Sequence, residues 1–481
     1  MAGFLLVSVF ISSLLSVHPN DSFWGSFLRQ QGFYNFFNYL LFFALIILNL
    51  KDFKQVKKII IAVIASASLT VVYGFVQYFN LDPIRWTENG LSTDRIFSAL
   101  GQPNFFGHYL ILVIPFSLYC LIFMAKSFFS RFFIGLALLA QLVCLVFTYS
   151  RAAWLGFLGS MIFLLIFWLL YKRFKKIAYA FMGLLLVGLG LIVFLNLTDN
   201  SAVNAPAPLG IVNRIKSMAD FKSGSGKMRF YYIKYALEEI KRESPLRLLA
   251  GSGPETLTGL YLKYYQIDWG IYETINTVPD RAHNWLFDQI LALGILGLLA
   301  TLLFYIFIIY KAIRFVLGRP KLESDDWLLI FLFASLTAYC INNFFSFSLF
   351  TVLVYLYLIL ALAWFIINYQ QEEKIINIRL TVFSKLLIWL ALLACSAVFI
   401  YTNNINQARA EIYYIKAIKS FRASDFQGVI NNFNKTIQLS PGSSYYQEDY
   451  LFLLLNCLPA IKNKADMAKL YNNLLLHIEE I

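Results

Sequence analysis

The sequence predicts an all-α membrane protein that crosses the bilayer many times, and three observations lead to this expectation. Hydrophobic residues make up 59% of its 481 residues and charged residues only 14%, whereas about 25% of the residues of a soluble chain are charged. Apolar stretches recur that are long enough to cross the hydrocarbon layer, which takes about 20 helical residues. The connections between these stretches alternate between strongly basic and nearly uncharged, as loops on opposite sides of a membrane do.

The apolar stretches predict about eleven transmembrane helices. They lie near residues 2–16 (a short one), 33–50, 58–79, 104–124, 132–149, 153–171, 177–195, 284–310, 327–342, 347–368 and 384–401. We therefore expect a polytopic membrane domain over residues 1–401, with a large external loop at 196–282. The more polar residues 402–481 are expected to form a small helical domain.

The basic residues indicate the orientation. The connections at 51–58, 125–131, 171–176, 311–321 and 373–385 together carry seventeen Lys and Arg, whereas the short connections of opposite parity carry only Arg29, Arg85, Arg95 and Arg151. Basic loops stay in the cytoplasm, so the 196–282 loop and the C-terminal domain are expected outside. The net charge of +13 is then a topology signal, and nucleic acid is not an expected partner.

Cysteine usage and the first apolar stretch argue against a disulfide framework, a zinc site and a cleavable signal peptide. The five cysteines are scattered, and four of them fall in apolar stretches, so neither a disulfide framework nor a zinc site is expected. The first apolar stretch, Phe4 to Leu15, lacks a basic start and a convincing cleavage site of small residues, so no cleavable signal peptide is expected.

Both external segments show helical patterns. In 226–243, Phe230, Ile233, Leu237 and Ile240 recur at helical spacing, which predicts an amphipathic helix lying on the membrane or covering an outward cavity. These apolar residues should face an apolar surface, with Arg229 in the first turn pointing inward. Residues 417–446 have the helix, Asp turn, helix and Pro of one tetratricopeptide-like unit, which predicts a docking module for a protein partner.

Polar residues collect at the mouths of several spans on the predicted outer side. His283 stands at the start of a span with Arg281 and Asn284 beside it, and Gly294 and Gly297 follow eleven and fourteen residues later. At 100° per residue these glycines fall within about 40° of the histidine's face, where they let a helix or a chain-like ligand approach closely. Arg151 begins another span, Arg229 stands in the loop helix, and Arg95 precedes a span with Asn104 at its mouth.

Each of these residues also has an ordinary interpretation. An arginine at the end of a span is usually an interfacial anchor, and His283 alone could be an interfacial hydrogen-bonding group. His18 and His108 have no pattern of partners around them and are expected to be incidental. Taken together, these residues are harder to explain in this way. Arginine is uncommon in external connections, and here several external arginines occur together with a histidine.

The residue types point to one chemistry. Arginine forks bind a diphosphate through bidentate, charge-assisted hydrogen bonds, and a neutral histidine can remove a proton from a hydroxyl. No external Asp-x-Asp or His-rich cluster offers a divalent metal site. The prediction is metal-independent transfer from a diphosphate leaving group to a hydroxyl without a cofactor. The expected catalytic residues are His283, Arg229 and Arg151, and the expected substrate contacts are Arg95, Asn104, Arg214, Arg281 and Asn284.

The sequence resembles the bacterial O-antigen ligase and O-antigen polymerase family over roughly residues 20 to 370. The resemblance is carried by His283-Asn284 and, after nine intervening residues, Gly294-Ile-Leu-Gly297. It is supported by "RIFSALGQPNFFGHYL", "YSRAAWLGF", the helix with Arg229 and "GSGPETL". It implies transfer of a glycan from undecaprenyl diphosphate on the outer side of the bacterial cytoplasmic membrane. By motif position, Arg151 and Arg229 match the arginines that hold the diphosphate, and His283 matches the base.

The resemblance leaves several alternatives open. The acceptor can be lipid A core, a growing polysaccharide or a protein. Members usually have further apolar sequence before residues 22–33, which bears on the span count. A transporter, for example of inorganic carbon, is the competing class and should show polar or broken spans near the midplane. A non-catalytic membrane scaffold that uses its C-terminal domain is the third reading.

Overall fold

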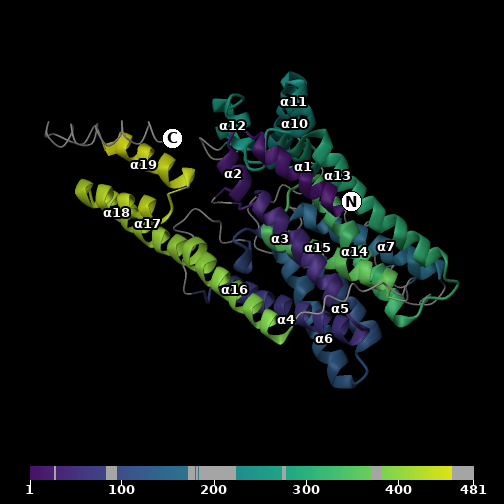
Figure 1. Ribbon diagram of the computed structural model, residues 1–481. Coiled ribbons are helices and arrows are strands. Elements are labelled where there is room, and N and C mark those ends of the chain that lie inside the picture. The colour runs from purple at the N-terminus through teal and green to yellow at the C-terminus, as the bar shows by residue number, and fades with distance from the viewer. Residues whose placement is uncertain are drawn as a thin grey trace, which may run out of the picture. The chain divides into compact units, whose positions relative to one another are not determined.

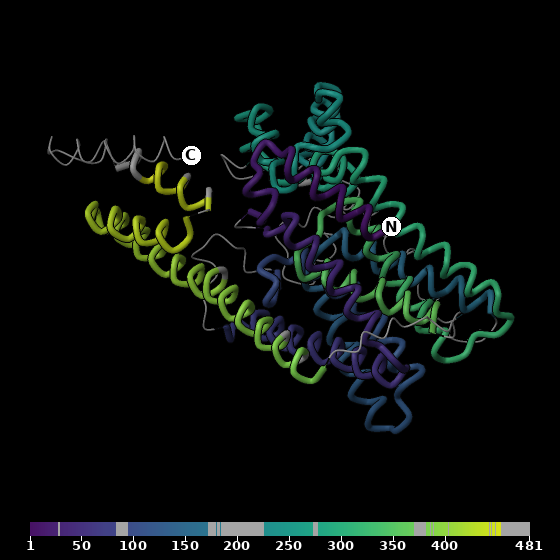
Figure 2. Tube along the Cα trace, in the orientation of Figure 1, coloured from purple at the N-terminus to yellow at the C-terminus, as the bar shows by residue number. Residues whose placement is uncertain are grey.

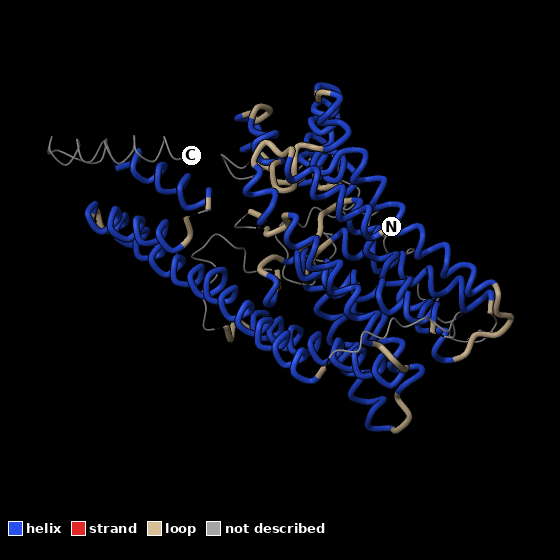
Figure 3. Tube along the Cα trace, in the orientation of Figure 1, coloured by secondary structure: helices blue, strands red, loops and turns tan. Residues whose placement is uncertain are grey.

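The computed structural model describes residues 1–26, 29–82, 95–171, 224–272, 278–369, 381–441 and 443–457, together with Tyr179 and Gly183. Within these residues every regular element is a helix, as Figure 3 shows. The predicted all-α class of a polytopic membrane protein is therefore confirmed.

The longer helices follow the predicted apolar stretches. They are α1 (Ala2–Leu14), α3 (Phe33–Asn49), α4 (Phe53–Tyr78), α5 (Pro103–Tyr119, continued by η3 to Met124), α6 (Phe128–Phe147), α7 (Arg151–Leu170), α13 (Trp285–Leu317), α14 (Ser324–Phe344), α15 (Phe350–Asn368) and α16 (Val382–Ile400). Eight of these helices in the described part of the chain are long and apolar enough to cross a membrane, and α1 and α3 are shorter apolar helices. The predicted span at 177–195 lies outside the described residues, so the count of eleven is not confirmed.

The described helices divide into two compact units. The first contains the helices up to α15, and the second contains α16 and the helices after it. The predicted domain boundary at residue 402 stays a prediction, although the last apolar helix groups with the C-terminal helices.

The centre of the first unit consists of α5, α14 and α15. About 72–83% of the apolar window of each of these helices is buried, compared with 22% for α6. Helix α14 packs against α5, α7 and α15, and α3 packs against α15. Figure 2 shows the course of the chain through this bundle. Gly156 of α7 permits close packing, because a Cβ there would come within 2.8 Å of the Ala338 carbonyl oxygen of α14.

The two ends of this helix bundle carry different connections. At one end, Lys57 pairs with Asp325 and the Tyr171 hydroxyl donates to the Val316 carbonyl, which brings the basic connections together. At the other end, Arg95 donates to the Thr148 carbonyl and Asn284 donates to the Phe344 carbonyl. The candidate residues thus gather at the end away from the basic connections.

Three helices of the predicted external loop lie together at the candidate end, where α1 ends and α13 begins (Figure 1). They are α10 (Gly224–Arg242), α11 (Pro245–Ala250) and α12 (Leu257–Leu262). Their core is largely aromatic, and it contains Tyr232 and Tyr235 of α10, Tyr261 of α12 and Trp269.

Within the protein, α10 buries a different face from the one that carries Phe230, and the contact of the Phe230 face with a membrane stays a prediction. Phe230 and Leu237 are 66% and 42% exposed, whereas Met228, Tyr232, Tyr235 and Ala236 are buried. Both sets of residues have helical spacing, and the buried set is the one joined by hydrogen bonds to the rest of the loop. The Tyr261 hydroxyl donates to the Tyr232 carbonyl, and Gln266 donates to the Tyr235 hydroxyl. A buried tyrosine needs such a partner for its polar end.

The second unit contains α16 followed by η6, α17 (Asn406–Arg422), α18 (Phe426–Leu439) and α19 (Ser444–Cys457). Asp425 begins α18, because its side chain accepts the Gly428 amide hydrogen as an N-cap. Ala417, Val429, Phe433 and Tyr450 form a small core between the helices. This arrangement has the helix–turn–helix that was expected at 417–446, and its tetratricopeptide-like character stays a prediction.

Candidate functional site

Helix α13 is broken at Gly294, which has φ 69° and ψ −176°. The prediction that His283, Gly294 and Gly297 share one helical face was therefore wrong, because 100° per residue cannot be counted across the break. A Cβ at Gly294 would overlap the Leu249 carbonyl oxygen, and a Cβ at Gly297 would overlap the Leu293 side chain. The break therefore needs glycine at both positions, because a larger residue would overlap its neighbours. The segment that approaches Gly294 is a loop and not a helix.

The loop at 251–253 replaces the helical hydrogen bonds that the break removes. The Ser252 and Gly253 amides donate to the carbonyls of Leu291 and Ala292, at 2.9 and 3.0 Å, and the Ser12 hydroxyl of α1 also donates to Ala292 at 2.7 Å. The freed carbonyls are satisfied, as buried backbone groups must be. The "GSG" stretch thus has a structural role.

The N-terminal helices hold this loop from its other side. The Val17 amide donates to the Ser252 carbonyl, and the Ser22 hydroxyl of α2 (Pro19–Trp24) donates to the Pro254 carbonyl at 2.6 Å. Gly253, with φ 104°, leaves room for the side chains of Ser16 and Ser22. The position of Glu255, the next residue along, is therefore fixed.

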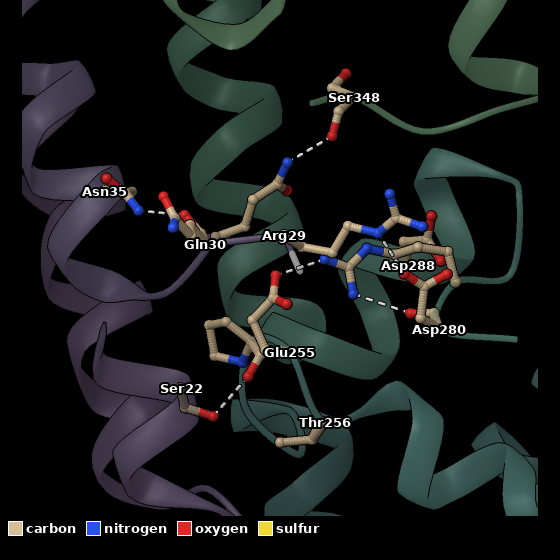
Figure 4. Close-up of polar contacts among 12 residues, drawn as sticks. Ser22, Arg29, Gln30, Asn35, Glu255, Thr256, Asp280, Asp288 and Ser348 are labelled. Atoms are coloured by element: carbon tan, nitrogen blue, oxygen red, sulfur yellow. Dashed lines mark hydrogen bonds and ion pairs between the residues drawn. The ribbon is translucent and has the colours of Figure 1, made fainter. Parts of the chain in front are cut away.

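Glu255 forms a buried ion pair with Arg281 at 2.5 Å, and their side chains are 2% and 9% exposed (Figure 4). Arg281 also donates to the Asp280 carbonyl at 2.9 Å. Burial would lower the pKa of Arg281, but Glu255 and Asp280 outweigh it and hold that pKa above its ordinary value. The ion pair fixes the chain directly before His283.

Asn284 fixes the chain directly after His283. Its side-chain oxygen accepts the Leu286 amide at 3.1 Å, as the N-cap of α13, and its NH₂ donates to the Phe344 carbonyl at 3.0 Å. Asn284 is only 3% exposed. It therefore ties the start of α13 to the end of α14.

His283 lies between two aromatic rings. Its imidazole stacks on the Tyr232 ring of α10, with ring centroids 5.4 Å apart. It makes a T-shaped contact with the Phe347 ring, with centroids 5.2 Å apart and an angle of 71° between the ring planes. The backbone has φ 54°, which a histidine adopts only where its surroundings impose it. The Nδ1 atom is buried and has no hydrogen-bond partner among the described residues.

Burial and nearby cations lower the pKa of His283 to about 4 from an ordinary 6.5. Burial is the largest cause, and among the charges Arg229 contributes most, followed by Asp280, which acts in the opposite direction. The imidazole is therefore neutral at physiological pH, and Arg229 is an electrostatic neighbour of it.

Arg229 is the sixth residue of α10 as described, so the prediction that it stands in the first turn was wrong. The electrostatic benefit of a helix N-terminus fades within that turn. The influence of Arg229 at the site therefore comes from its own guanidinium.

Arg95 binds both Asn104 and the turn before Arg151. Arg95 donates to the Asn104 side-chain oxygen at 3.0 Å and to the Thr148 carbonyl at 2.9 Å. Arg151 is the first residue of α7, directly after this turn. A Cβ on Gly107 of α5 would touch Ala153 at 2.8 Å, so α5 and the start of α7 are packed too closely for a larger residue.

Four further residues contact the site and were not among those predicted from the sequence: Arg29, Asp280, Phe347 and Tyr232. Arg29 pairs with Asp280 at 2.5 Å, and its guanidinium lies over the Phe347 ring at 4.9 Å. Burial would raise the pKa of Asp280, but Arg281 and Arg29 outweigh it and lower that pKa. A sequence signal existed only for Arg29, as one of the few arginines in the uncharged set of connections.

The remaining predicted residues lie elsewhere. Arg214 lies outside the described residues. His18 is an exposed residue before α2, whereas His108 is fully buried in α5 with its ring 5.4 Å from that of Tyr339. Among the described residues no group of three or more His, Cys, Asp or Glu side chains is placed to hold a metal ion.

The comparison with protein families bears on this site. Residues 134–302 match the O-antigen ligase family. The match to the O-antigen ligase model runs from α6 into α13 and contains Arg151, Arg229, Arg281, His283 and Asn284. It supports an O-antigen ligase-type glycosyltransferase embedded in a membrane, with a lipid-linked glycan donor. No curated protein matches the chain.

Proposed function

We propose that the protein transfers a glycan from undecaprenyl diphosphate to an acceptor hydroxyl on the outer side of the cytoplasmic membrane. The observation that carries this proposal is the stack of His283 on Tyr232 of α10, the helix that also carries Arg229. Burial and Arg229 lower the pKa of His283 to about 4, so the base is neutral. A base and a cation placed together are what an attack by a hydroxyl on a diphosphate-linked sugar needs.

In the proposed reaction, His283 takes the proton of the acceptor hydroxyl while that oxygen attacks the anomeric carbon. The bond from the anomeric carbon to the diphosphate breaks, and the diphosphate leaves with the electron pair. Arg229 and Arg151 bind the leaving group and stabilise the negative charge that grows on it. Attack from the face opposite the leaving group inverts the anomeric configuration.

The predicted substrate contacts take two kinds of role in this proposal. The polar atoms of Arg281 and Asn284 are bonded to Glu255 and to the backbone, so these two residues position His283 from either side. Arg95 holds the turn that presents Arg151, and Asn104 accepts a hydrogen bond from Arg95. Arg214 remains a proposed contact of the donor.

A transporter is less well supported by the geometry. The break in α13, at the tenth residue of the helix, is a feature that broken transporter helices share. Its freed carbonyls accept from Ser252, Gly253 and Ser12, whereas the broken helices of transporters leave such groups free to coordinate the cargo.

The test is glycan transfer from purified lipid-linked donor with a chelator present throughout. His283→Ala should lower the transfer rate by about 10²–10⁴ and leave donor binding nearly unchanged. Arg229→Ala should weaken donor binding as well, and Arg229→Lys should restore little, because a point charge cannot reproduce the guanidinium fork. Full activity of His283→Ala would refute the base, and loss of wild-type activity in chelator would refute metal independence.

A further inference from the structure

Large apolar side chains are exposed where α10 ends and α11 begins, outside the predicted spans. Leu246 and Leu249 of α11 are 60% and 47% exposed, and Leu237 of α10 is 42% exposed. Helix α11 itself packs against α13, and Ala250 at its end is buried. The exposed leucines therefore form a surface that no described residue of the first unit covers.

The length of α13 places this surface at the edge of the membrane. Helix α13 has 33 residues, whereas α14 and α15 have 21 and 19. Crossing the hydrocarbon layer takes about 20 helical residues, and the part of α13 after the break at Gly294 has this length by itself. The turns before the break carry Asp288 and Gln289, which are costly in hydrocarbon. The boundary of the hydrocarbon layer at the candidate end therefore lies near Gly294.

Helix α11 lies beside this boundary. The Leu249 carbonyl oxygen is so close to Gly294 that a Cβ there would overlap it. The turn of α13 that follows the break exposes Ile295, Leu296 and Leu299, by 36%, 41% and 47%, and in a span such apolar side chains face lipid. The apolar surface of α11 therefore continues the lipid-facing surface of α13 toward the headgroups.

Cations accompany the exposed leucines. Lys241 and Arg242 are exposed at the C-terminal end of α10, directly before α11. The acidic side chain next to them, Glu243, accepts a hydrogen bond from Ser252 at 3.1 Å and so is directed to the loop at 251–253. A segment that combines apolar side chains with lysine and arginine binds at a membrane surface, where its cations attract anionic lipids. An apolar protein surface would leave both cations without an anion.

We propose that the α10–α11 corner, which consists of Lys241, Arg242, Leu246 and Leu249, docks on the membrane surface and binds the headgroups of acidic phospholipids. The leucines enter the headgroup region beside α13, and the two cations bind lipid phosphates. Helix α11 ends directly before the loop at 251–253, which donates to the carbonyls at the break. The lipid contact thus holds the segment that closes the break in α13. This inference does not depend on the proposed transfer reaction.

The first experiment measures whether the corner reaches lipid. In full-length protein whose native cysteines are replaced, Leu246→Cys and Leu249→Cys are labelled with a fluorophore. Each variant is placed as a single copy in nanodiscs whose lipids carry a spin label in the upper part of the acyl chain. The fluorescence should be quenched at both positions, as at Leu299→Cys, an exposed position of the α13 span. Thr258→Cys, an exposed position on α12, is the control and should stay unquenched.

The second experiment identifies the headgroup. Spin-labelled phosphatidylglycerol or phosphatidylcholine is added as a minor component to phosphatidylcholine nanodiscs that hold the labelled Leu246→Cys protein. Phosphatidylglycerol should quench at a concentration at least about fivefold lower, since each basic residue near a membrane surface contributes about that factor. The preference should disappear in Lys241→Gln/Arg242→Gln. It should persist in Lys54→Gln/Lys58→Gln, which removes two exposed cations at the other end of the bundle.

The outcomes separate the occupants of the corner. Lack of quenching at either 246 or 249 would overturn the membrane contact. Shielding of an unquenched label only when two copies share a nanodisc would assign the corner to a second copy of the chain instead. Equal quenching by the two lipids, or a preference that survives in Lys241→Gln/Arg242→Gln, would overturn the assignment to acidic headgroups.

Discussion

At the residue scale, the candidate site concentrates unusual backbone conformations. Gln30, Tyr149, Glu255 and His283 all have positive φ, between 49° and 66°, and each lies in a segment that carries a residue of the site. Such conformations cost about 1–3 kcal/mol each and persist only where the surrounding structure imposes them. The buried ion pair of Glu255 and the aromatic stack of His283 supply that constraint.

The pH dependence of transfer should report the neutral state of His283. A base works only when unprotonated, so activity is lost as the pH falls through its pKa. Because burial and Arg229 lower that pKa to about 4, the acidic limb of kcat/KM should lie near pH 4 and not near 6.5. Arg229→Ala removes the largest charge contribution and should move the limb to higher pH, without reaching 6.5, since burial remains.

The matched control for this profile is Lys234→Ala. Lys234 is an exposed cation on the same helix, next to Glu238, and it is not among the charges that act on His283. Its substitution should leave the limb in place. An acidic limb near 6.5 in the wild type would contradict the neutral-base assignment.

Variants of the Arg281–Glu255 pair test whether this ion pair only stabilises the fold or also positions His283. Arg281→Ala leaves a carboxylate uncompensated in a buried place, which costs about 3–5 kcal/mol, so the melting temperature in detergent should fall. Glu255→Gln/Arg281→Met removes both charges and should recover much of that stability. Transfer should stay impaired in the double variant, because the ion pair no longer fixes the chain before His283. A double variant with full activity would show that the pair only stabilises.

The residues of the site could be predicted from the sequence only in part. His283 and the arginines stand out because polar groups at span mouths are costly and external arginines oppose the topology bias. Phe347 and Tyr232 could not be found, because aromatic residues are abundant in this chain and only the fold shows which rings meet the imidazole. Asp280 was missed for the same reason, since its partner Arg29 is 251 positions away.

At the element scale, the helices follow from their apolar lengths, but the break in α13 does not. Two glycines three residues apart in a span usually indicate close helix packing. Here the approaching element is the 251–253 loop, which donates to the carbonyls of Leu291 and Ala292. The sequence also does not show which face of α10 is buried within the protein. Two sets of residues on this helix have the same spacing, and only the contacts in the folded protein decide between them.

Gly294→Ala should disrupt the site through this break. Its φ of 69° and ψ of −176° lie in a region that is essentially open to glycine alone, at a cost of about 1–3 kcal/mol for other residues. The new Cβ would also overlap the Leu249 carbonyl oxygen. We expect a lower melting temperature and transfer reduced by about 10²-fold, since a displacement of about 1 Å at a catalytic group has that effect.

Gly135→Ala is the control for this substitution. Gly135 lies inside α6, and a Cβ there would meet nothing within 4 Å. Alanine is favoured over glycine in a helix by about 1 kcal/mol, so the melting temperature should stay the same or rise. Equal effects of the two substitutions would mean that the break does not depend on glycine.

At the scale of the whole molecule, the charge pattern and the helix bundle agree on which connections share an end. Lys57–Asp325 and Tyr171–Val316 join the basic connections, and Arg95–Thr148 and Asn284–Phe344 join the opposite set. The alternation could be predicted because each transmembrane span carries the chain to the opposite side of the membrane. The identity of the outer side rests on the positive-inside rule alone.

Labelling of single cysteines in whole cells tests that orientation. In a protein whose native cysteines are replaced, Asn49→Cys, Thr258→Cys and Asn434→Cys introduce thiols at exposed positions without changing charge. Asn49 precedes the basic 51–58 connection, whereas Thr258 is in α12 and Asn434 in α18. A reagent that cannot cross the cytoplasmic membrane should label positions 258 and 434 in intact cells, and position 49 only after the membrane is disrupted.

Retained transfer activity of each variant shows that its fold is intact. Labelling of 49 but not 258 would reverse the orientation and move His283 to the cytoplasmic side, and labelling of 258 but not 434 would place the C-terminal helices on the opposite side from the site.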